Sequence, residues 1–523
     1  MDRLSAEYIL GIDSSTSGTK ACLWTLEGEL TASGSAPHSV ERPHPGWAEQ
    51  EASWDGALFR ALEQLFSQTD IQPEQIAAVG ITHQRHSFVP VDASFRPLSR
   101  AILWNDVRCQ AEIDFLAEAI GKEKLYRTTG IPPGPWSLAK ILWLKGNRPE
   151  LFARTHKFLL VHDYLVYHLT GELCTTESSA SAMGCLDILN RRRWAEPVLS
   201  ALEIPVDKFV PSIRPAGTVL GRIIPEAARA TGLKEGTPVI AAAGDQVCGC
   251  LAAGLVKPGQ VGVNSGTSLT FQTLTVDPTF DPDCHYILEI SPLGCYAAET
   301  VVFSGVSDLC EWYRRVFAGL EEQQAQQTGV SVWEVIFAET AAVPPGSEGL
   351  MVFPFFQGVQ APYWSNDARG MLIGLSTAHT RHHAARAILE GLAYEARRQI
   401  ELLESGTGNA IDEILLYGGG ARNRLWCQIL ASVTGRKVKA SAQTEATALG
   451  AAMCAAWGIK RFQSLEEAVA SMGAPYEVFL PDRALFEFYD RLYHQVYQPF
   501  YGRVQDLDAL RTRLSSFGVS STT

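Results

Sequence analysis

The residues best suited to chemistry in this sequence are Gly244-Asp245-Gln246, which follow the apolar run 237–243. A run of small and β-branched residues between turn signals predicts a buried strand. In an open α/β sheet, ligands bind at the carboxyl ends of the strands. A single carboxylate at such an end, flanked by a glycine and an amide, suits a general base. We therefore expect Asp245 to be a catalytic base, although these residues alone would also fit a simple turn.

The overall composition is that of an ordinary globular protein. The 523 residues, 46% hydrophobic and 19% charged, predict two or more domains with a sizeable core. The net charge of −13 argues against nucleic acid or a membrane surface as partner, but glycine-rich turns can still hold a nucleotide in an acidic protein. We see no signal-peptide pattern and no apolar run of the roughly 18 residues that span a membrane. The eleven scattered cysteines predict reduced thiols in a cytoplasm.

A hydroxyl-rich turn follows the first predicted strand, residues 8–13. The turn, residues 14–20, offers backbone N–H groups, several hydroxyls and the ammonium group of Lys20 to a phosphate chain. Asp13, at the end of the strand, is placed to hold a metal ion directly or through water. A plain β-hairpin with a loop rich in serine and threonine is the alternative.

The same plan of strand, Ser/Thr/Gly turn and strand occurs again at residues 260–274, where the turn is Ser265-Gly266-Thr267-Ser268. A plan repeated in two halves predicts two similar domains, which we divide as residues 1–252 and 253–523. Two facing turns would clamp one polyphosphate from both sides. A third turn, Gly418-Gly419-Gly420, joins a predicted strand to a predicted helix, so its backbone can approach a flat ligand.

Two polar clusters follow predicted strands in the N-terminal half. The first is residues 83–87, which include Gln84, Arg85 and His86, and the second is residues 105–108, which follow Trp104. Such a mixture of donors and acceptors is suited to a pocket for a polyhydroxylated ligand. Each cluster would also fit a loop whose polar groups are satisfied locally.

Together these motifs resemble the FGGY carbohydrate kinases, from about residue 8 to residue 500. One family signature is nearly met by residues 370–390, with Ala384 where a larger apolar residue is usual. The other, around residues 135–147, is met at positions that include Lys140 but departs at Pro135 and Gly146. The resemblance implies an α/β fold of two actin/hexokinase-like (ribonuclease-H-like) ATPase domains that face a central cleft.

The resemblance also implies transfer of a phosphoryl group from ATP, with Mg²⁺, to a hydroxyl of a sugar or polyol, and it suggests a homodimer. Asp245 matches the family's general base, and Asp13 matches the acid beside the metal. The residues implied for the nucleotide are Thr16, Ser17, Lys20, Gly266, Thr267, Gly418, Gly419, Gly420 and Asn423. The residues implied for the acceptor are Gln84, Arg85, His86, Trp104, Asn105, Asp106, Asp245 and Gln246.

The favoured acceptor is a ketopentose, D-xylulose first. His86 and the run from Trp104 to Asp106 resemble xylulose kinases. Arg85 after Gln84 resembles glycerol kinases, which however carry an acid where this chain has His86. A polyol kinase for glycerol or erythritol therefore stays open. An actin-like ATPase clamp that phosphorylates no sugar also stays open, although it would need no polar pocket of this kind.

Overall fold

Two sheets form the centres of two units in the computed structural model, which describes residues 7–516. Unit 1 contains Met1–Lys257, Leu274–Ala298 and Glu445–Ala474, and unit 2 contains Pro258–Thr273, Glu299–Thr444 and Pro475–Thr523. The chain therefore passes more than once between the units. The predicted domain boundary at residue 253 stays a prediction. It divides the chain once, whereas each unit combines three separate stretches of it.

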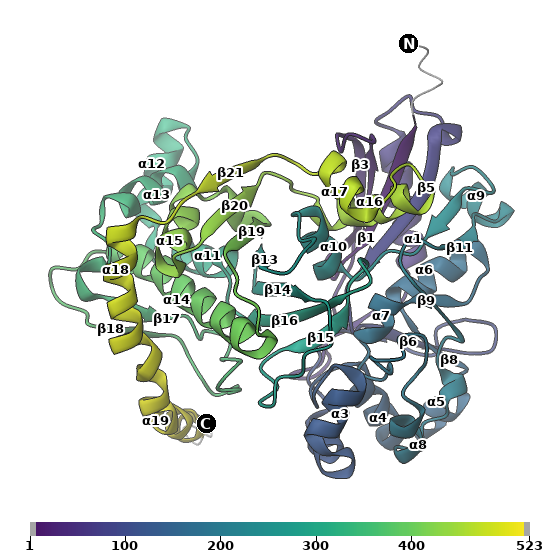
Figure 1. Cartoon of the computed structure of the whole chain (residues 1–523), viewed down its shortest axis with the longest axis horizontal. Helices are drawn as coiled ribbons and strands as arrows, with labels where there is room; N and C mark the ends of the chain where they lie inside the picture. The colour runs from purple at the N-terminus through teal and green to yellow at the C-terminus, as the bar shows by residue number, and fades with distance from the viewer. Residues whose placement is uncertain (1–6, 517–523) are drawn as a thin grey trace, which may run out of the picture. The chain divides into compact units, whose positions relative to one another are not determined.

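The sheet of unit 1 has six strands in the order β11-β12-β5-β1-β2-β3 (Figure 1). Strand β1 is parallel to β5 on one side and antiparallel to β2 on the other. The strands are β1 (Tyr8–Ser14), β2 (Gly18–Trp24), β3 (Leu30–Pro37), β5 (Ile76–His83), β11 (Val219–Arg222) and β12 (Pro238–Ile240). The strands predicted at 8–13 and 76–82 are confirmed, and the one predicted at 237–243 is present but shorter.

Helices cover the two faces of this sheet. Helix α1 (Trp54–Phe66) packs on β2 and β3, in one apolar core with Leu10 and Ile12 of β1. Gly11 alternates with those two residues and so points to the opposite face, where α16 (Ala446–Gly458) packs. A Cβ atom at Gly11 would lie 2.1 Å from the carbonyl oxygen of Ala448, so only glycine admits the helix there. The prediction that this small-residue helix packs closely is confirmed.

Helix α10 (Asp245–Ala252) packs against α16 in the same unit. A Cβ atom at Gly450 would lie 2.0 Å from the carbonyl oxygen of Cys248. Cys248 and Cys250 are buried here, as predicted for small core residues. Because α10 is fixed on α16, the residue that begins it, Asp245, has a defined position relative to β1.

The remaining part of unit 1 carries the second polar cluster. A four-stranded sheet has the order β4-β7-β6-β8. Strand β7 covers only Ala101–Ile102, shorter than the predicted run 101–104. The small polar residues 177–181 form a buried helix, α7. The other elements of this unit are β4 (Glu49–Gln50), β6 (Phe88–Val91), β8 (Lys157–Leu160), β9 (Cys174–Thr176), β10 (Ser212–Arg214), β15 (Ile287–Ile290), α2 (Gln110–Leu116), α3 (Lys122–Thr129), α4 (Ser137–Asn147), α5 (Pro149–Arg154), α6 (Val161–Thr170), α7 (Glu177–Ser181), α8 (Glu196–Ala201), α9 (Pro225–Thr231) and α17 (Leu465–Met472).

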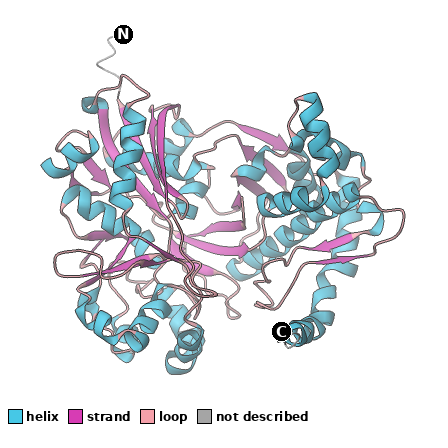
Figure 2. Ribbon diagram, turned by 180° about the vertical axis from the view of Figure 1, so that it is seen from behind, coloured by secondary structure: helices cyan, strands magenta, loops and turns pink. Residues whose placement is uncertain are grey.

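The second sheet has seven strands in the order β15-β16-β14-β13-β19-β20-β21, of which β13, β19, β20 and β21 lie wholly in unit 2. Figure 2 draws the strands of the chain in magenta and its helices in cyan. Strand β13 is antiparallel to β14 and parallel to β19, so it repeats the arrangement of β1. The helix predicted after the glycine loop is confirmed as α15, and the long helix α14 belongs to the same unit. The elements are β13 (Gln260–Ser265), β14 (Leu269–Thr275), β16 (Tyr296–Val302), β17 (Met351–Phe353), β18 (Met371–Ile373), β19 (Glu413–Tyr417), β20 (Lys437–Ser441), β21 (Tyr476–Phe479), α11 (Val306–Phe317), α12 (Gly319–Thr328), α13 (Val332–Ala342), α14 (Arg381–Thr407), α15 (Arg424–Thr434), α18 (Arg483–Leu492) and α19 (Gln498–Ser516).

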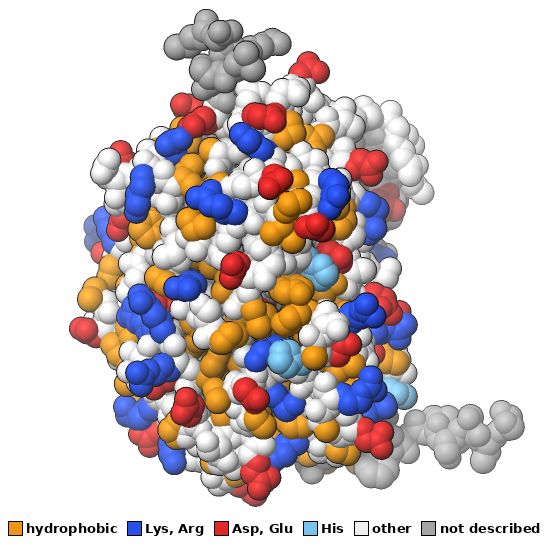
Figure 3. Space-filling view, turned by 90° about the vertical axis from the view of Figure 1, so that its right-hand side faces the viewer, with side chains coloured by type: hydrophobic (Ala, Val, Ile, Leu, Met, Phe, Trp, Pro, Cys, Tyr) orange, Lys and Arg blue, Asp and Glu red, His pale blue; other side chains and the backbone are white. Residues whose placement is uncertain are grey.

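The surface and the cysteines bear on the classes of partner. On the face drawn in Figure 3, Lys and Arg side chains are interspersed with Asp and Glu, without a field of one sign. Within residues 7–516, no helix is both long enough and apolar enough to cross a membrane. All eleven cysteines are free thiols, and nine of them are buried.

Candidate active site

Asp245 is the first residue of α10, at the point where the chain leaves β12. Its side chain is 23% exposed, so the carboxylate is held by the fold yet reachable. The Oδ1 atom accepts a hydrogen bond from Arg85 Nε at 3.2 Å and another from the N–H of Gln246 at 2.9 Å. The amino-terminal end of a helix favours negative charge. The carboxylate thus begins the helix that follows β12, and its role as the base stays a prediction.

Arg85 links this carboxylate to a second one that the sequence did not reveal. It follows β5 and is 6% exposed. Its Nη1 atom donates to Glu289 Oε2, and Glu289 is fully buried in β15. The guanidinium thus lies between two acidic groups. No sequence signal could have paired residues 85 and 289, because only the tertiary fold brings β15 beside this turn.

Asp13 has the features of a metal ligand. It is the penultimate residue of β1, and its Oδ2 atom accepts a hydrogen bond from Thr447 Oγ1 at 2.7 Å. The Oδ1 atom is buried and has no hydrogen-bond partner among the described residues. Burial raises the pKa of this carboxyl to about 7, against the Thr447 hydrogen bond and with a further contribution from the charge of Asp245. A buried acidic oxygen without a donor is suited to Mg²⁺, which prefers oxygen ligands, so the residues fit this ion.

The other predicted residues of the first turn differ in their environments. Lys20 pairs with Glu445, which precedes α16, at 2.9 Å from both carboxylate oxygens. Ser17 is exposed in the turn. Thr16 donates to Gln84 Oε1 at 3.1 Å and accepts from Trp104 Nε1 at 2.9 Å. The fold therefore joins Thr16, predicted for the nucleotide, to two residues predicted for the acceptor.

Trp104 and Asn105 present groups that a ligand can use. The indole of Trp104 is 43% exposed, an unusual position for so large an apolar side chain. Asn105 Oδ1 is buried and lacks a hydrogen-bond partner within residues 7–516. The buried amine of Lys140 donates to the carbonyls of Leu103 and Trp104, at 2.7 Å each, and so fixes this loop. Burial lowers the pKa of Lys140 to about 7.

Asp106 is satisfied by its own surroundings. Its two oxygens accept hydrogen bonds from Arg108, and Oδ2 also accepts one from the N–H of Ala48 at 2.6 Å. Arg108 in turn lies over the ring of Trp47 and pairs with Glu49. This geometry favours a positioning role for Asp106, whereas the sequence grouped it with the acceptor ligands. Its contact with an acceptor stays a prediction.

His86 is a buried and neutral group. Its Nδ1 atom bonds to the carbonyl oxygen of Ala182, and its ring lies 4.8 Å from that of Trp136. Burial, followed by the charges of Arg85 and Lys140, lowers the pKa of His86 well below 6.5. The neighbouring His83 bonds to Ser179 of α7 at 3.0 Å. Helix α7 thus holds both histidines in place, which explains why its small polar residues are buried.

The nucleotide residues predicted in unit 2 lie together. Strands β13 and β19 are parallel neighbours with Asn264 opposite Tyr417, so the turns that follow them are adjacent. A Cβ atom at Gly420 would lie 2.1 Å from Ser265 Oγ, which fixes how closely the glycine loop approaches the turn. The carbonyl oxygen of Gly266 accepts from the N–H of Ser307 in α11 at 3.1 Å.

The turn 265–268 and the glycine loop of unit 2 contain polar groups that a nucleotide could bind. Thr267, in the turn after β13, and Gly419, in the glycine loop, are both exposed. Asn423 caps α15 through the N–H of Trp426, and its Nδ2 atom is buried without a partner in the described part of the chain. Ser265 Oγ is likewise buried and unpartnered there. The sequence placed Ser265 in the predicted turn without giving it a role, and it missed Ser307, because a serine near the start of a helix carries no distinctive signal.

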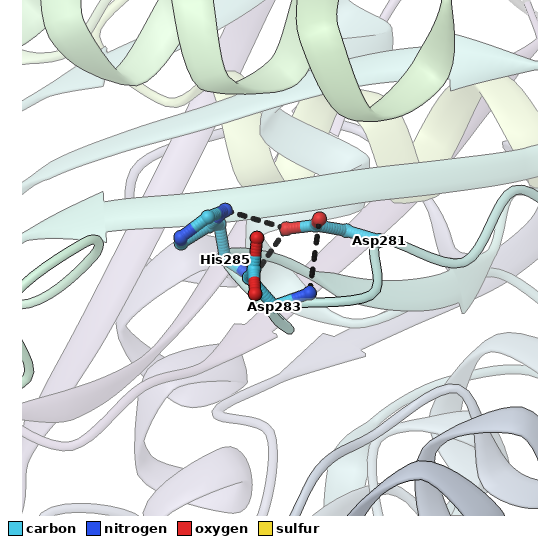
Figure 4. A group of neighbouring side chains, drawn as sticks. All are labelled: Asp281, Asp283 and His285. Atoms are coloured by element: carbon cyan, nitrogen blue, oxygen red, sulfur yellow. Dashed lines mark hydrogen bonds and ion pairs between the residues drawn. The ribbon is translucent and has the colours of Figure 1, made fainter.

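A group of possible metal ligands, Asp281, Asp283 and His285, also escaped the sequence analysis (Figure 4). Their ligand-type atoms lie within 4.8 Å of one another. Asp281 accepts hydrogen bonds from the N–H groups of Asp283 and His285 and pairs with His285 Nδ1 at 2.7 Å. These bonds order the segment before β15 and account for the grouping without an ion.

Comparison with known proteins assigns the family. The N-terminal domain of the FGGY family of carbohydrate kinases matches residues 8–252, and the C-terminal domain matches residues 262–459. The xylulose kinase of Bacillus subtilis (strain 168) is 30% identical over 515 residues, which cover 98% of this chain and 99% of that protein. The gluconokinase of the same organism is 28% identical over 478 residues, 90% of this chain and 91% of that protein.

The fold agrees with the sequence matches. The crystal structure of xylulose kinase from Rhodospirillum rubrum superposes with a TM-score of 0.86 at 28% identity, covering 96% of this chain and 100% of that one. The predicted resemblance and the mixed α/β two-domain fold are therefore confirmed, as is the activity class, a kinase that phosphorylates a carbohydrate with ATP. By two domain matches and relatives aligned along nearly its whole length, this chain belongs to the FGGY family of carbohydrate kinases.

Proposed function

We propose that this protein transfers the γ-phosphoryl group of ATP to D-xylulose and forms D-xylulose 5-phosphate. The observation that carries the proposal is Asp245, a partly exposed carboxylate that begins α10 and pairs with Arg85 of the acceptor cluster. Relatives named xylulose kinase, about 30% identical over nearly the full chain, support this substrate over other sugars. Phosphoryl transfer asks the protein chiefly for positioning, charge stabilisation and a base near the attacking hydroxyl.

Asp245 would take the proton of the attacking hydroxyl. Arg85 and the N–H of Gln246 both donate to Oδ1, which fixes the orientation of the carboxylate. A well-placed general base typically contributes about 10²–10⁴ in rate. Trp104 and Asn105 would orient the sugar, one through its exposed ring and the other through its unpartnered buried oxygen.

Asp13 would hold Mg²⁺ through its buried Oδ1 atom. When bound, Mg²⁺ would neutralise charge on the transferred phosphoryl group. Thr447 fixes the orientation of Asp13 by its hydrogen bond to Oδ2. Lys20, paired with Glu445, lies on the strand β2 that faces Asp13 in register, so its ammonium group is near the same phosphates.

The nucleotide residues of unit 2 complete the proposal. The turn with Gly266 and Thr267 would receive phosphates on its backbone N–H groups, and the loop Gly418–Gly420 would pack against adenosine. Asn423 would offer its unpartnered Nδ2 donor. The closing of two domains over a central cleft, which would exclude water from the transfer, stays a prediction.

A polyol kinase is the second candidate, because Arg85, the residue that resembles glycerol kinases, lies beside Asp245. The change His86→Glu tests this reading, since it supplies the acid that glycerol kinases carry at this position. If the acceptor lies beside residue 86, the preference of the variant moves toward glycerol. An unchanged preference would contradict this placement of the acceptor.

The proposed reaction is tested by ADP release with Mg²⁺-ATP across D-xylulose, L-xylulose, D-ribulose, L-ribulose, glycerol and erythritol. We expect a large rate with D-xylulose and small rates with the others. A rate with a polyol alone would replace the proposed acceptor. ADP release that depends on no acceptor would favour the actin-like ATPase clamp instead.

We place the reaction in the cytoplasm, which the eleven free thiols support. A homodimer stays a prediction from the family. Sedimentation of the purified protein at several concentrations would test it.

A further inference from the structure

The strongest unexplained feature of unit 1 is the buried acid Glu289, which binds the arginine next to the catalytic base. Glu289 is 0% exposed, and Arg85 donates to its Oε2 atom. The N–H of the neighbouring Ile290 donates a hydrogen bond to Ser181 Oγ of α7, at 3.2 Å, so the strand that carries Glu289 is held in register. A fully buried carboxylate is costly unless its charge has a use or a partner.

The ion pair between Arg85 and Glu289 changes the charge that the acceptor site presents. One guanidinium, which stays protonated, lies between the carboxylates of Asp245 and Glu289. Two acidic groups therefore face one cation, and the group as a whole carries an excess of negative charge. Because Arg85 Nη1 is directed toward the carboxylate of Glu289, we expect removal of that charge to make the guanidinium more available to an acid on the acceptor.

The other cations of the acceptor cluster are also engaged. Lys140 donates to the carbonyls of Leu103 and Trp104, and Arg108 pairs with Asp106 and Glu49. His86 is neutral at pH 7, because burial lowers its pKa well below 6.5. An acceptor that carries a carboxylate would thus meet engaged cations and an excess of negative charge. An uncharged sugar or polyol would meet no such repulsion.

We propose that Glu289 is a specificity-determining residue that reserves the acceptor site for uncharged sugars and polyols and rejects aldonates. It acts by binding Arg85, so that this guanidinium is not offered to an acceptor carboxylate. The inference rests on the proposed acceptor site around Asp245 and Arg85. It matters for this family, because relatives named xylulose kinase and gluconokinase match the chain to nearly the same extent.

The test is the change Glu289→Gln, which keeps an acceptor oxygen for Arg85 and removes the charge. The quantity measured is the ratio of kcat/KM for D-xylonate to kcat/KM for D-xylulose, two acceptors with five carbons each. We expect this ratio to rise about 10-fold or more, mainly through a lower KM for D-xylonate, as expected for removal of one nearby buried charge. A ratio unchanged from wild type, or an equal loss with both acceptors, would overturn the proposal.

Two matched variants distinguish the effect of the Glu289 charge from a general loss of structure or activity. Glu289→Asp keeps the charge, so the ratio should stay near that of wild type; a rise there would show that charge is not the cause. Glu390→Gln removes another buried glutamate, which pairs with Arg386 in α14 of unit 2 at 2.9 Å. This control should leave the ratio unchanged, and a rise there would also contradict the proposal.

A binding measurement covers variants with little turnover. The dissociation constants of D-xylonate and D-xylulose, followed by intrinsic tryptophan fluorescence, should give the same shift in ratio. If the wild type acts on another uncharged acceptor, the proposed substrate fails, and the ratio is taken against that acceptor. If the wild type prefers an aldonate over every uncharged acceptor, Glu289 does not reject aldonates. The protein would still be a carbohydrate kinase.

Discussion

The turn of unit 1 after β1 and the turn of unit 2 after β13 have one backbone plan and different charges. Each joins two antiparallel strands through three residues, 15–17 and 266–268. Each is closed by a backbone hydrogen bond, of 2.9 Å in unit 1 and 3.1 Å in unit 2. Each first strand has a parallel neighbour on its other side, β5 or β19.

The side chains around the two turns differ sharply. In unit 1 the pair facing each other across the strands is Asp13 and Lys20, and Asp245 lies close by. In unit 2 the pair in a comparable place is Asn264 and Thr270, both uncharged. We infer that the charged copy carries out the transfer and that the neutral copy holds the nucleotide.

The largest expected effect comes from Asp245→Asn, which removes the base and keeps the shape of the side chain. Turnover should fall by about 10²–10⁴, the typical contribution of a general base. The measurement is the rate of D-xylulose phosphorylation, with circular dichroism to show that the fold is retained. Substantial activity in this variant would show that Asp245 is not the general base of the transfer.

Asp13→Asn makes the first turn resemble the second, where Asn264 stands. The variant should lose about 10²-fold in kcat, on the scale of removing one group that stabilises developing charge. The second readout is thermal unfolding of the protein with and without Mg²⁺. Mg²⁺ should raise the Tm of wild type and not of the variant; equal stabilisation of both would place the metal elsewhere.

Gly420→Ala tests the neutral turn by filling its space. The new methyl group would collide with Ser265 Oγ and displace the glycine loop. ADP binding should weaken about tenfold, or about 1.4 kcal/mol. The control is Gly319→Ala, because a Cβ atom there meets nothing within 4 Å. If ADP binds both variants as it binds wild type, the loop has no part in holding the nucleotide.

The smallest effect is a pH dependence that only the charged turn should show. The pKa of Asp13 is about 7 in the fold, above its ordinary 3.8, so the folded state binds more protons between those values. The stability contributed by this group is therefore present at low pH and is lost as pH rises toward 7. Without metal, the Tm of wild type should fall relative to that of Asp13→Asn between pH 5 and 8. A constant difference would contradict the burial of this carboxylate.

How much of this site the sequence can predict depends on the distance of the contacts along the chain. The strands that end at Asp13 and near Asp245 follow from apolar runs bounded by turn residues, and the glycine loop at residues 418–420 follows from its place between strand and helix. Each of these elements is specified by neighbouring residues, so a short segment of the sequence is enough to predict it.

The partners of these residues could not be predicted in the same way. Thr447 and Glu289 reach Asp13 and Arg85 only because α16 and β15 pack in unit 1. A threonine in a helix and a glutamate in a strand have no pattern that marks them. Asp106 illustrates the converse, because its type and position suit a ligand, whereas Arg108 and Ala48 already occupy its oxygens.

The most direct test of this division of labour is the dissociation constant of ADP for Asp245→Asn and Gly420→Ala, measured side by side by calorimetry. The account predicts that Asp245→Asn binds ADP within about twofold of wild type while Gly420→Ala binds it about tenfold more weakly. If instead Asp245→Asn lost ADP and Gly420→Ala kept it, the charged turn would be the nucleotide site and the account would be wrong.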